Sequence, residues 1–213
     1  MNPRTIYGYN GKILFIDLND QTFKFEERDE NFWRKYVGGG LASTLLLFEL
    51  TPPGIDPLSK DNLLIFSSSV AAGQPAPGLA RFTTSAKSPL TGGIGETRTE
   101  GPFGAAIKSC GADIIVFKGK AQKPVSVILG KGKISFIESH DWWGMLIGQA
   151  ADEIETKFGG NVHHAIIGPA GENLVRFASI VTDRTFQASR MGLTQHRWVS
   201  LFLLLWNYSE KEY

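Results

Sequence analysis

A glycine-rich stretch in the middle of the chain, residues 73–120, constrains the fold more than any other feature. It holds nine of the 24 glycines and four of the ten prolines. Glycine lets the backbone adopt a positive φ or approach another group closely, and proline fixes a turn. The stretch therefore predicts short elements joined by turns, with backbone that can lie close to a bound ligand.

A short helix is expected to begin within this stretch, at residues 101–104 (GPFG). Pro102 suits the first helical position because its missing N–H is not needed there. Phe103, Ile107 and Cys110 recur at the spacing of one buried helical face. The free N–H groups at such a helix start favour a phosphate or another anionic oxygen, so the segment predicts an anion site.

Cationic side chains able to assist an anion site are dispersed through the same stretch: Arg81, Lys87, Arg98 and Lys108. Together with the helix start, they indicate a cradle for a large anionic ligand. The alternative is an ordinary β-rich domain, in which glycine serves turns and arginine is a solvated surface group. The sequence has no G-x-x-x-x-G-K-S/T motif, and no Gly-x-Gly follows the first strand, which argues against P-loop and Rossmann nucleotide sites.

The composition limits the function classes. A chain of 213 residues forms one large domain or two small ones, and a hydrophobic share of 42% with a charged share of 20% is typical of globular proteins. The formal net charge of +1 gives no indication of nucleic acid or an anionic membrane as a partner. The N-terminus has no apolar signal-peptide core, which favours a cytoplasmic location.

The single cysteine, Cys110, rules out an intrachain disulfide and also a metal cluster held entirely by cysteines of this chain. Because it falls on the apolar face of the expected helix, it is predicted to be a buried core thiol. His163 and His164 lack a third spaced ligand, so structural or surface roles are predicted for them. No Ser-His-Asp arrangement or carboxylate pair can be placed from spacing. No catalytic residue and no metal ligand is therefore assigned.

The hydrophobic pattern predicts strand pairs with interspersed helices rather than a strict βαβ alternation. Strands are expected at residues 12–18, 22–27, 62–70, 80–86, 93–99, 113–118, 125–129, 133–137, 163–167 and 173–181. Helices are expected through residues 33–36, at residues 41–50, from residue 102 and at residues 145–158. This order favours an α+β fold with extensive antiparallel sheet.

Residues 41–50 (LASTLLLFEL) are almost entirely apolar and are expected to form a buried helix that ends before Pro52 and Pro53. Three glycines, Gly38, Gly39 and Gly40, break the chain just before it. They either line the ligand site or form a plain helix–helix turn.

Five segments follow one another along the chain: YGYNGKILFIDL, YVGGGLASTLLL, PLSKDNLLIFSSSVAAGQPAPGLARF, KSPLTGGIGETRTEGPFGAAIKSCGADIIVFKGKAQKPVSV and IIGPAGENLVRFASIVTDR. In this order they resemble the N-terminal domain of the tungsten-dependent aldehyde ferredoxin oxidoreductase family. No single segment is diagnostic, but so many in the right order make a chance likeness implausible. The resemblance implies a pair of largely antiparallel β-sheets with interspersed helices, forming a base for a tungsten (or molybdenum) bis-pyranopterin cofactor.

The resemblance also implies the site residues. Arg81, by its position in the PAPxxxR segment, corresponds to an arginine between pterin and iron–sulfur cluster, and residues 95–104 correspond to a loop that contacts pterin phosphates and a bridging Mg²⁺. The family often has asparagine where Arg98 stands, and arginine cannot ligate a metal. Arg98 is therefore expected to take a phosphate directly, with Glu96 as its salt-bridge partner. The residues assigned to cofactor binding are Arg81, Gly95, Glu96, Thr97, Arg98, Thr99, Gly101, Phe103, Gly104 and Arg190.

Full-length members of the family oxidise aldehydes to carboxylic acids and pass electrons through a 4Fe–4S cluster to ferredoxin. The cluster's four cysteines and most of the catalytic machinery come from later domains, and this chain has Cys110 alone. The resemblance thus implies a partial enzyme that needs C-terminal domains or a complementing chain, with no nucleic-acid or membrane partner. The alternative is a non-catalytic truncated domain or an assembly and binding module. A generic binder of phosphate ligands is a third, remote interpretation.

The resemblance ends near residue 193. Residues 183–193 follow only part of the family's HRAAGRGGxGAVMGSK-like segment, and residues 194–213 do not follow it at all. The sequence therefore predicts a cofactor-binding domain at residues 1–193 and a divergent tail at 194–213. Either a change of reading frame near Leu193 produced the tail, whose apolar run would then pack poorly, or the tail is a genuine terminal helix. Its apolar run is too short to span a membrane.

Overall fold

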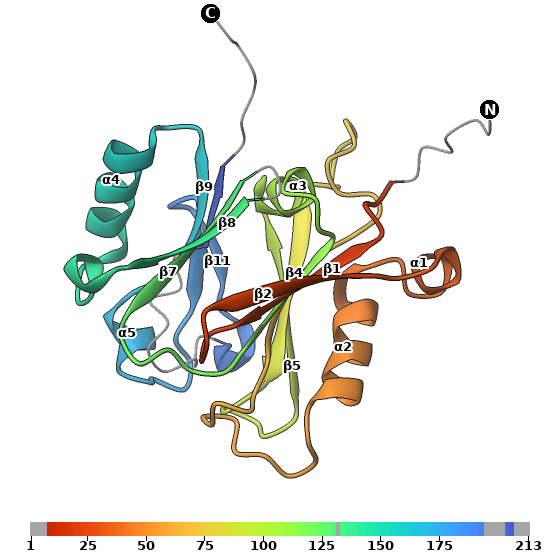
Figure 1. Ribbon diagram of the computed structural model, residues 1–213, viewed down its shortest axis with the longest axis horizontal. Coiled ribbons are helices and arrows are strands. Elements are labelled where there is room, and N and C mark those ends of the chain that lie inside the picture. The colour runs from red at the N-terminus through yellow and green to blue at the C-terminus, as the bar shows by residue number, and fades with distance from the viewer. Residues whose placement is uncertain (1–7, 131–132, 194–202, 207–213) are drawn as a thin grey trace, which may run out of the picture.

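The computed structural model describes residues 8–130, 133–193 and 203–206, which form two six-stranded β-sheets flanked by helices (Figure 1). The first sheet has the order β2-β1-β6-β3-β4-β5, and the second has the order β11-β10-β9-β12-β7-β8. The strands of the first sheet are β1 (Lys12–Asp17), β2 (Thr22–Glu27), β3 (Leu64–Ser68), β4 (Arg81–Lys87), β5 (Ile94–Glu100) and β6 (Ile114–Lys118). Those of the second are β7 (Val125–Gly130), β8 (Lys133–Glu138), β9 (Val162–Ile167), β10 (Ile180–Thr182), β11 (Phe186–Ala188) and β12 (Leu203–Trp206).

Neighbouring strands run antiparallel throughout both sheets, except that β1 pairs with β6 and β12 pairs with β7 in parallel. The helices are α1 (Glu30–Tyr36), α2 (Gly39–Leu50), α3 (Phe103–Ser109), α4 (Ile147–Phe158) and α5 (Pro169–Glu172), with short 3₁₀ turns at η1 (His140–Trp142) and η2 (Arg190–Gly192). The predicted α+β class with two largely antiparallel sheets is therefore confirmed.

Alternate residues of the central strands point to opposite faces of the first sheet and so build two separate cores. On β1, Leu14 and Ile16 join the cluster between the two sheets, whereas Ile13 joins the cluster beneath α2. On β3 every residue is buried, because Phe66 faces one cluster and Ile65 the other. These strands read as continuous apolar runs because both of their faces are covered.

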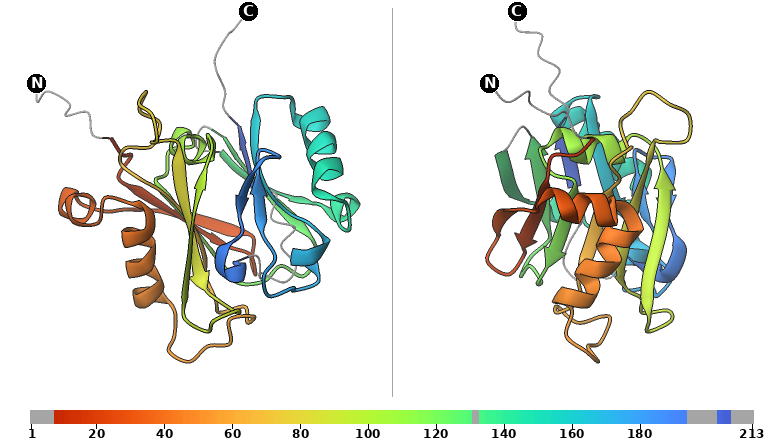
Figure 2. Two further views of the ribbon diagram at one scale, coloured as in Figure 1. Left: turned by 180° about the vertical axis from the view of Figure 1, so that it is seen from behind. Right: turned by 90° about the vertical axis from the view of Figure 1, so that its right-hand side faces the viewer.

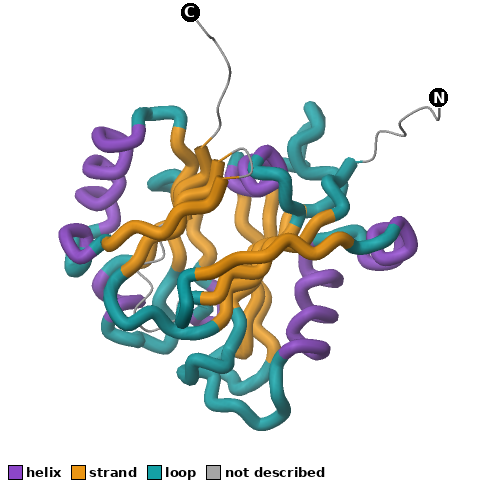
Figure 3. The backbone as a smooth tube through the Cα atoms, in the orientation of Figure 1, coloured by secondary structure: helices purple, strands orange, loops and turns teal. Residues whose placement is uncertain are grey.

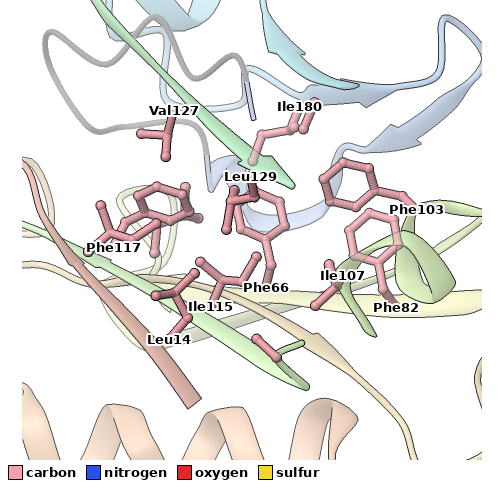
Figure 4. Packing of buried hydrophobic residues seen from close by; sticks show 14 of the residues in the cluster. Leu14, Phe66, Phe82, Phe103, Ile107, Ile115, Phe117, Val127, Leu129 and Ile180 are labelled. Carbon is pink, nitrogen blue, oxygen red and sulfur yellow. The ribbon is translucent and has the colours of Figure 1, made fainter. Parts of the chain in front are cut away.

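The cluster between the sheets contains side chains from both sheets and from α3 (Figure 4). Two phenylalanines of the first sheet pack against Phe103 of α3. The ring centroid of Phe66 lies 5.9 Å from that of Phe103, and the ring centroid of Phe82 lies 5.1 Å from it. Leu129 and Ile180 approach the same cluster from the second sheet. The sheets thus share one core, and α3 closes part of it.

Helices cover the two remaining sheet faces, so the molecule is layered helix, sheet, sheet, helix (Figures 2 and 3). Helix α4 buries Ala150, Ala151 and Ile154 against β9, as its predicted amphipathic pattern requires. Helix α2 packs Leu46 against the first sheet. Residues 41–50 form the predicted helix, but the prediction that this helix is buried is wrong, because Phe48 on the far side of α2 is 74% exposed.

The predicted strand at residues 173–181 is also wrong for residues 173–179. Residues 169–172 form α5, and turn hydrogen bonds from Val175 N to the Ala170 carbonyl and from Ala178 N to the Val175 carbonyl follow it. Leu174 has a positive φ of 58°, which a strand does not allow. The real strand, β10, begins at Ile180 and turns back as β11, which the sequence pattern did not predict.

In the divergent tail, residues 203–206 form β12, which lies between β7 and β9 in the second sheet. The alternative that the tail is a terminal helix is wrong for these residues. Residues 194–202 and 207–213 lie outside the described part of the chain, as do the turn residues 131–132 of the predicted β7–β8 hairpin. No helix in the described part is long and apolar enough to cross a membrane.

Candidate functional site

The register of β4 and β5 decides how the predicted site residues are arranged. Directly paired residues share one face of a sheet. Arg81 pairs with Glu100, and Arg98 pairs with Thr83, so the two arginines lie on the same face. We call this face the β4–β5 outer face; it carries Arg81, Thr83, Ser85, Glu96, Arg98 and Glu100.

The two guanidinium groups on the outer face are exposed and held by carboxylates. Arg81 Nη2 lies 2.5 Å from Glu100 Oε1, and Arg98 Nε lies 2.9 Å from Glu96 Oε1. The arginine side chains are 56% and 71% exposed. The predicted pairing of Glu96 with Arg98 is thus confirmed. Because exposed ion pairs contribute about 0–1 kcal/mol, a more strongly charged ligand can displace the carboxylates at little cost.

The start of α2 packs onto the same face, and the three glycines make this possible. A Cβ on Gly38 would overlap the Ser68 carbonyl oxygen, and a Cβ on Gly40 would overlap the Glu96 carboxylate. Further along α2, Ser43 Oγ lies 2.8 Å from Ser85 Oγ. The triple glycine therefore allows close packing of α2 against β3 and Glu96.

The N-terminus of α2 has the electrostatic character that the sequence assigned to α3. Its N-cap, Gly38, provides no side-chain acceptor for the N–H groups of the first turn. A helix start carries partial positive charge, so the Glu96 carboxylate beside Gly40 is favourably placed. The sequence left open whether the three glycines line the ligand site. It could not predict the contact between Gly40 and Glu96, because these residues lie in separate elements with no local pattern that joins them.

The segment at the start of α3 serves packing. Phe103 is fully buried, and a Cβ on Gly104 would lie 2.7 Å from the Arg81 carbonyl oxygen. A Cβ on Gly101 would lie 2.5 to 2.8 Å from the ring of Phe186. These three positions bring α3, β4 and β11 together, and their role in cofactor binding stays a prediction.

The remaining predicted residues of β5 point the other way, toward the second sheet. Thr97 and Thr99 are each 3% exposed, and a Cβ on Gly95 would lie 2.5 Å from Leu193. Arg190 is exposed in η2, and the next carbonyl, that of Met191, accepts a 2.7 Å hydrogen bond from Ser88 Oγ. The fold thus brings the backbone next to Arg190 beside the start of β5, and the role of Arg190 in cofactor binding stays a prediction.

A cavity of about 500 Å³ lies beside α3, lined by residues that include Tyr9, Gly73, Lys108 and His163. Neither Arg81 nor Arg98 lines it. Lys108 Nζ donates hydrogen bonds of 2.8 to 3.1 Å to the carbonyls of Ser69, Val70 and Ala72. Burial lowers the pKa of Lys108. Its ammonium group fastens the loop after β3 and is not available to a ligand.

Cys110, His163 and His164, for which the sequence predicts no metal-binding role, have partners within the protein. Burial raises the pKa of Cys110 to about 11, and its thiol donates to the Leu129 carbonyl at 3.7 Å, as expected for a core thiol. His163 Nδ1 lies 3.2 Å from Asp183, and His164 Nε2 lies 3.3 Å from Glu155. In the described residues, no three His, Cys, Asp or Glu side chains gather as a metal site would require.

Comparison with known proteins gives one consistent family. The model of a family described as "Aldehyde ferredoxin oxidoreductase, N-terminal domain" matches residues 13–196. The tungsten-containing aldehyde ferredoxin oxidoreductase of Pyrococcus furiosus is 40% identical over 190 residues, which cover 88% of this chain and 31% of that protein. The aliphatic sulfonate oxidoreductase WOR-like subunit of the same organism is 33% identical, covering 88% of this chain and 32% of that protein.

A solved structure has the same fold. It is the active site complex BamBC of benzoyl coenzyme A reductase with 1,5 dienoyl-CoA, with a TM-score of 0.90 and 27% sequence identity. The match covers 96% of this chain and 32% of that chain. In each of these comparisons, the chain spans about a third of the length of the protein that it matches.

Proposed function

Because the chain belongs to the aldehyde ferredoxin oxidoreductase family, whose N-terminal domain it carries, we propose that it is the cofactor-binding part of an oxidoreductase that converts aldehydes to carboxylic acids, with ferredoxin as the electron acceptor. The chain covers 31% of its Pyrococcus furiosus relative. The substrate pocket and the contact with ferredoxin therefore belong to C-terminal domains or to a complementing chain. A cytoplasmic location is part of the same proposal.

The observation that carries the proposal is the pair of exposed guanidiniums on the β4–β5 outer face, next to the uncapped start of α2. The cofactor we propose is a tungsten (or molybdenum) bis-pyranopterin, whose phosphates call for N–H and guanidinium donors. Arg81 and Arg98 supply such donors, and their present carboxylate partners are weakly held. The donor set thus fits a doubly phosphorylated ligand.

When bound, the cofactor supplies the metal centre for oxygen-atom and electron transfer. The chain's own residues bind and orient it. Arg98 would bind a phosphate of the cofactor, and Arg81 would neutralise charge on the pterin and the cluster and tune the redox potential by hydrogen bonding. Glu96 and Glu100 lie beside these arginines, and their carboxylate oxygens are the kind of ligand that would hold a Mg²⁺ ion at the cofactor phosphates.

The 4Fe–4S cluster has its ligands elsewhere in the complete enzyme. Cys110 is the single cysteine of the chain, and it is buried in the core between the sheets. On its own the chain is therefore an incomplete, inactive enzyme. The same observation favours a second candidate function, that of a non-catalytic truncated domain or assembly module.

The test is to produce the chain together with the C-terminal two thirds of the Pyrococcus furiosus relative in an anaerobic, tungsten-fed host. Pterin fluorescence and tungsten content of the purified complex are then measured. The parent complex is expected to contain pterin, and Arg81→Ala with Arg98→Ala is expected to lose most of it. Arg34→Ala, which removes another exposed arginine paired with a glutamate, is the matched control. A complex without pterin would favour the assembly module instead.

A further inference from the structure

Helix α2 is apolar on the side that faces away from the sheet. Leu41, Leu45 and Phe48 follow one another at i, i+4 and i+7, which places them on one helical face. Leu41 is 56% exposed and Phe48 is 74% exposed. The packed side carries Ala42 and Leu46, so α2 is apolar on both sides. A helix that is hydrophobic all round is normally buried on both sides.

A groove of about 320 Å³ lies at the C-terminal end of this face. It is lined by residues that include Phe48, Pro52, Pro53 and Ile94. Phe48 belongs to both features, so the exposed face leads into the groove. We call Leu41, Leu45 and Phe48 together with the groove the α2 surface. Single exposed leucines are normal on proteins, but an apolar stripe joined to a groove marks a contact site.

We propose that the α2 surface is the docking site for the C-terminal part of the enzyme, whether covalently attached or supplied as a complementing chain. This inference rests on the proposed function. The chain covers only 31% of its Pyrococcus furiosus relative, so about two thirds of that relative's length, which the proposed function requires, has no counterpart in it. The partner segment presents aliphatic or aromatic side chains, one of which enters the groove beside Phe48.

The position of the α2 surface selects this partner over a second copy of the chain. Leu41 directly follows Gly40, where the Glu96 carboxylate lies beside the start of α2. A polypeptide docked here is therefore carried to the edge of the β4–β5 outer face, with Arg98 within its reach. Two copies pairing through the same surface would instead crowd the face that has to receive the cofactor.

The test uses the 213-residue chain and a tagged chain made of the C-terminal two thirds of the Pyrococcus furiosus relative. Their dissociation constant is measured without cofactor. The double variant Leu41→Glu with Phe48→Glu is expected to bind at least tenfold more weakly. The control Phe177→Glu changes a 71% exposed phenylalanine elsewhere and is expected to leave binding unchanged. Equal binding by all three proteins, or no binding by the parent, would overturn the inference.

Two further readouts separate folding and self-association from docking. Hydrogen exchange of residues 41–54 in the unmodified chain is expected to slow when the C-terminal chain is added, which requires no variant. Unchanged exchange there, in a complex that does form, contradicts the inference. Light scattering measures the mass of the chain alone. If the chain is a dimer, and the double substitution of Leu41→Glu with Phe48→Glu makes it a monomer, a second copy occupies the α2 surface and the inference is overturned.

The same proteins distinguish this inference from the proposed function. Arg81→Ala with Arg98→Ala is expected to keep docking and lose pterin. If docking depends on the α2 surface but no complex contains pterin, the result supports the inference and contradicts the proposed cofactor role. If the complexes contain pterin but the α2 substitutions do not weaken binding between the two chains, the inference is wrong and the proposed function is still supported.

Discussion

At the residue scale, Gly38 and Gly40 lie in one short motif but are required for different reasons. A Cβ on Gly38 would overlap the Ser68 carbonyl oxygen, which is backbone, and φ at Gly38 is +74°. A Cβ on Gly40 would overlap the Glu96 carboxylate, which is the movable end of a side chain. The first conflict requires β3 to move, whereas a rotation of Glu96 relieves the second.

Gly38→Ala is therefore expected to destabilise the fold by about 1–3 kcal/mol from the left-handed conformation alone, with the backbone overlap adding to this cost. Gly40→Ala is expected to change the free energy of unfolding by less than about 1 kcal/mol, because alanine is the better helix former. Urea unfolding of both variants measures the difference. Equal destabilisation would show that Glu96 cannot move and that the start of α2 is rigid.

The lowered pKa of Glu155 predicts that the stability of the fold depends on pH. Hydrogen bonds from Arg184 (2.7 and 2.8 Å) and then from His164 lower the pKa of Glu155 below its ordinary value near 4.5, although burial opposes this shift. A carboxylate whose pKa is lowered by folding stabilises the fold above the unfolded pKa. That contribution disappears as the pH falls through the folded pKa.

Glu155→Gln is expected to be less stable than the parent at pH 7, and the difference is expected to shrink as the pH falls below 4.5 and through the lowered pKa of Glu155. Unfolding midpoints at pH 7, 5 and 3 test this. Glu138→Gln removes a carboxylate from an exposed pair with Lys123 and serves as the control. A constant gap between Glu155→Gln and the parent at all three pH values would contradict the expectation.

The sequence predicted the contacts of the candidate site that depend on local periodicity. Glu96 and Arg98 are two residues apart on a strand, so their shared face and their ion pair follow from alternation. The approach of Gly40 to Glu96 depends on how α2 packs across β4, and no local pattern encodes that contact. The sequence therefore predicted an anion-favouring helix start at α3, which stays a prediction, and it did not predict that Glu96 lies beside the start of α2.

At the scale of elements, α3 is a packing element whose first residue holds the core together. Phe103 is fully buried, with its ring centroid 5.1 Å from that of Phe82 and 5.9 Å from that of Phe66.

Phe103→Ala is expected to cost about 3–5 kcal/mol in the free energy of unfolding, because it removes a large core side chain and leaves a cavity. Phe177→Ala, at a 71% exposed position, is expected to cost less than about 0.5 kcal/mol. Urea unfolding of both variants checks this, and a small effect of Phe103→Ala would indicate that α3 is not part of the core.

The hairpin of β10 and β11 shows why some elements could not be predicted. Its turn residues, Asp183 and Arg184, have φ values of 47° and 63°, where asparagine and glycine are the usual signals. Tertiary contacts hold this turn: Asp183 accepts from the backbone N–H of His164, and Arg184 donates to Glu155. A turn held by distant partners has no signature in its own residues. The sequence therefore predicted a strand over residues 173–181, where turns lead into β10, and did not predict β11.

At the scale of the whole molecule, the α+β class followed from the order of the elements, but the pairing of strands that are distant in the sequence did not. The hairpins β1–β2 and β7–β8 join consecutive strands and were predicted. The parallel pairing of β1 with β6, and the place of β12 between β7 and β9, join strands that are distant in the sequence. Such pairings depend on which faces the rest of the fold leaves uncovered, and that information is not local.

The central place of β12 makes the divergent tail a structural part of the second sheet. Leu203 pairs with Val127 on one side and with Ala165 on the other, so β12 is the strand that joins β7 to β9. Deleting residues 194–213 is expected to expose the backbone edges of β7 and β9 and to speed amide exchange there, while exchange in β3 and β6 of the first sheet changes little. Deleting residues 207–213 alone, which leaves β12 in place, is the control. If exchange in β7 and β9 does not change after the longer deletion, the tail does not complete the sheet. That result would support the hypothesis that the tail is an unrelated, poorly packed continuation.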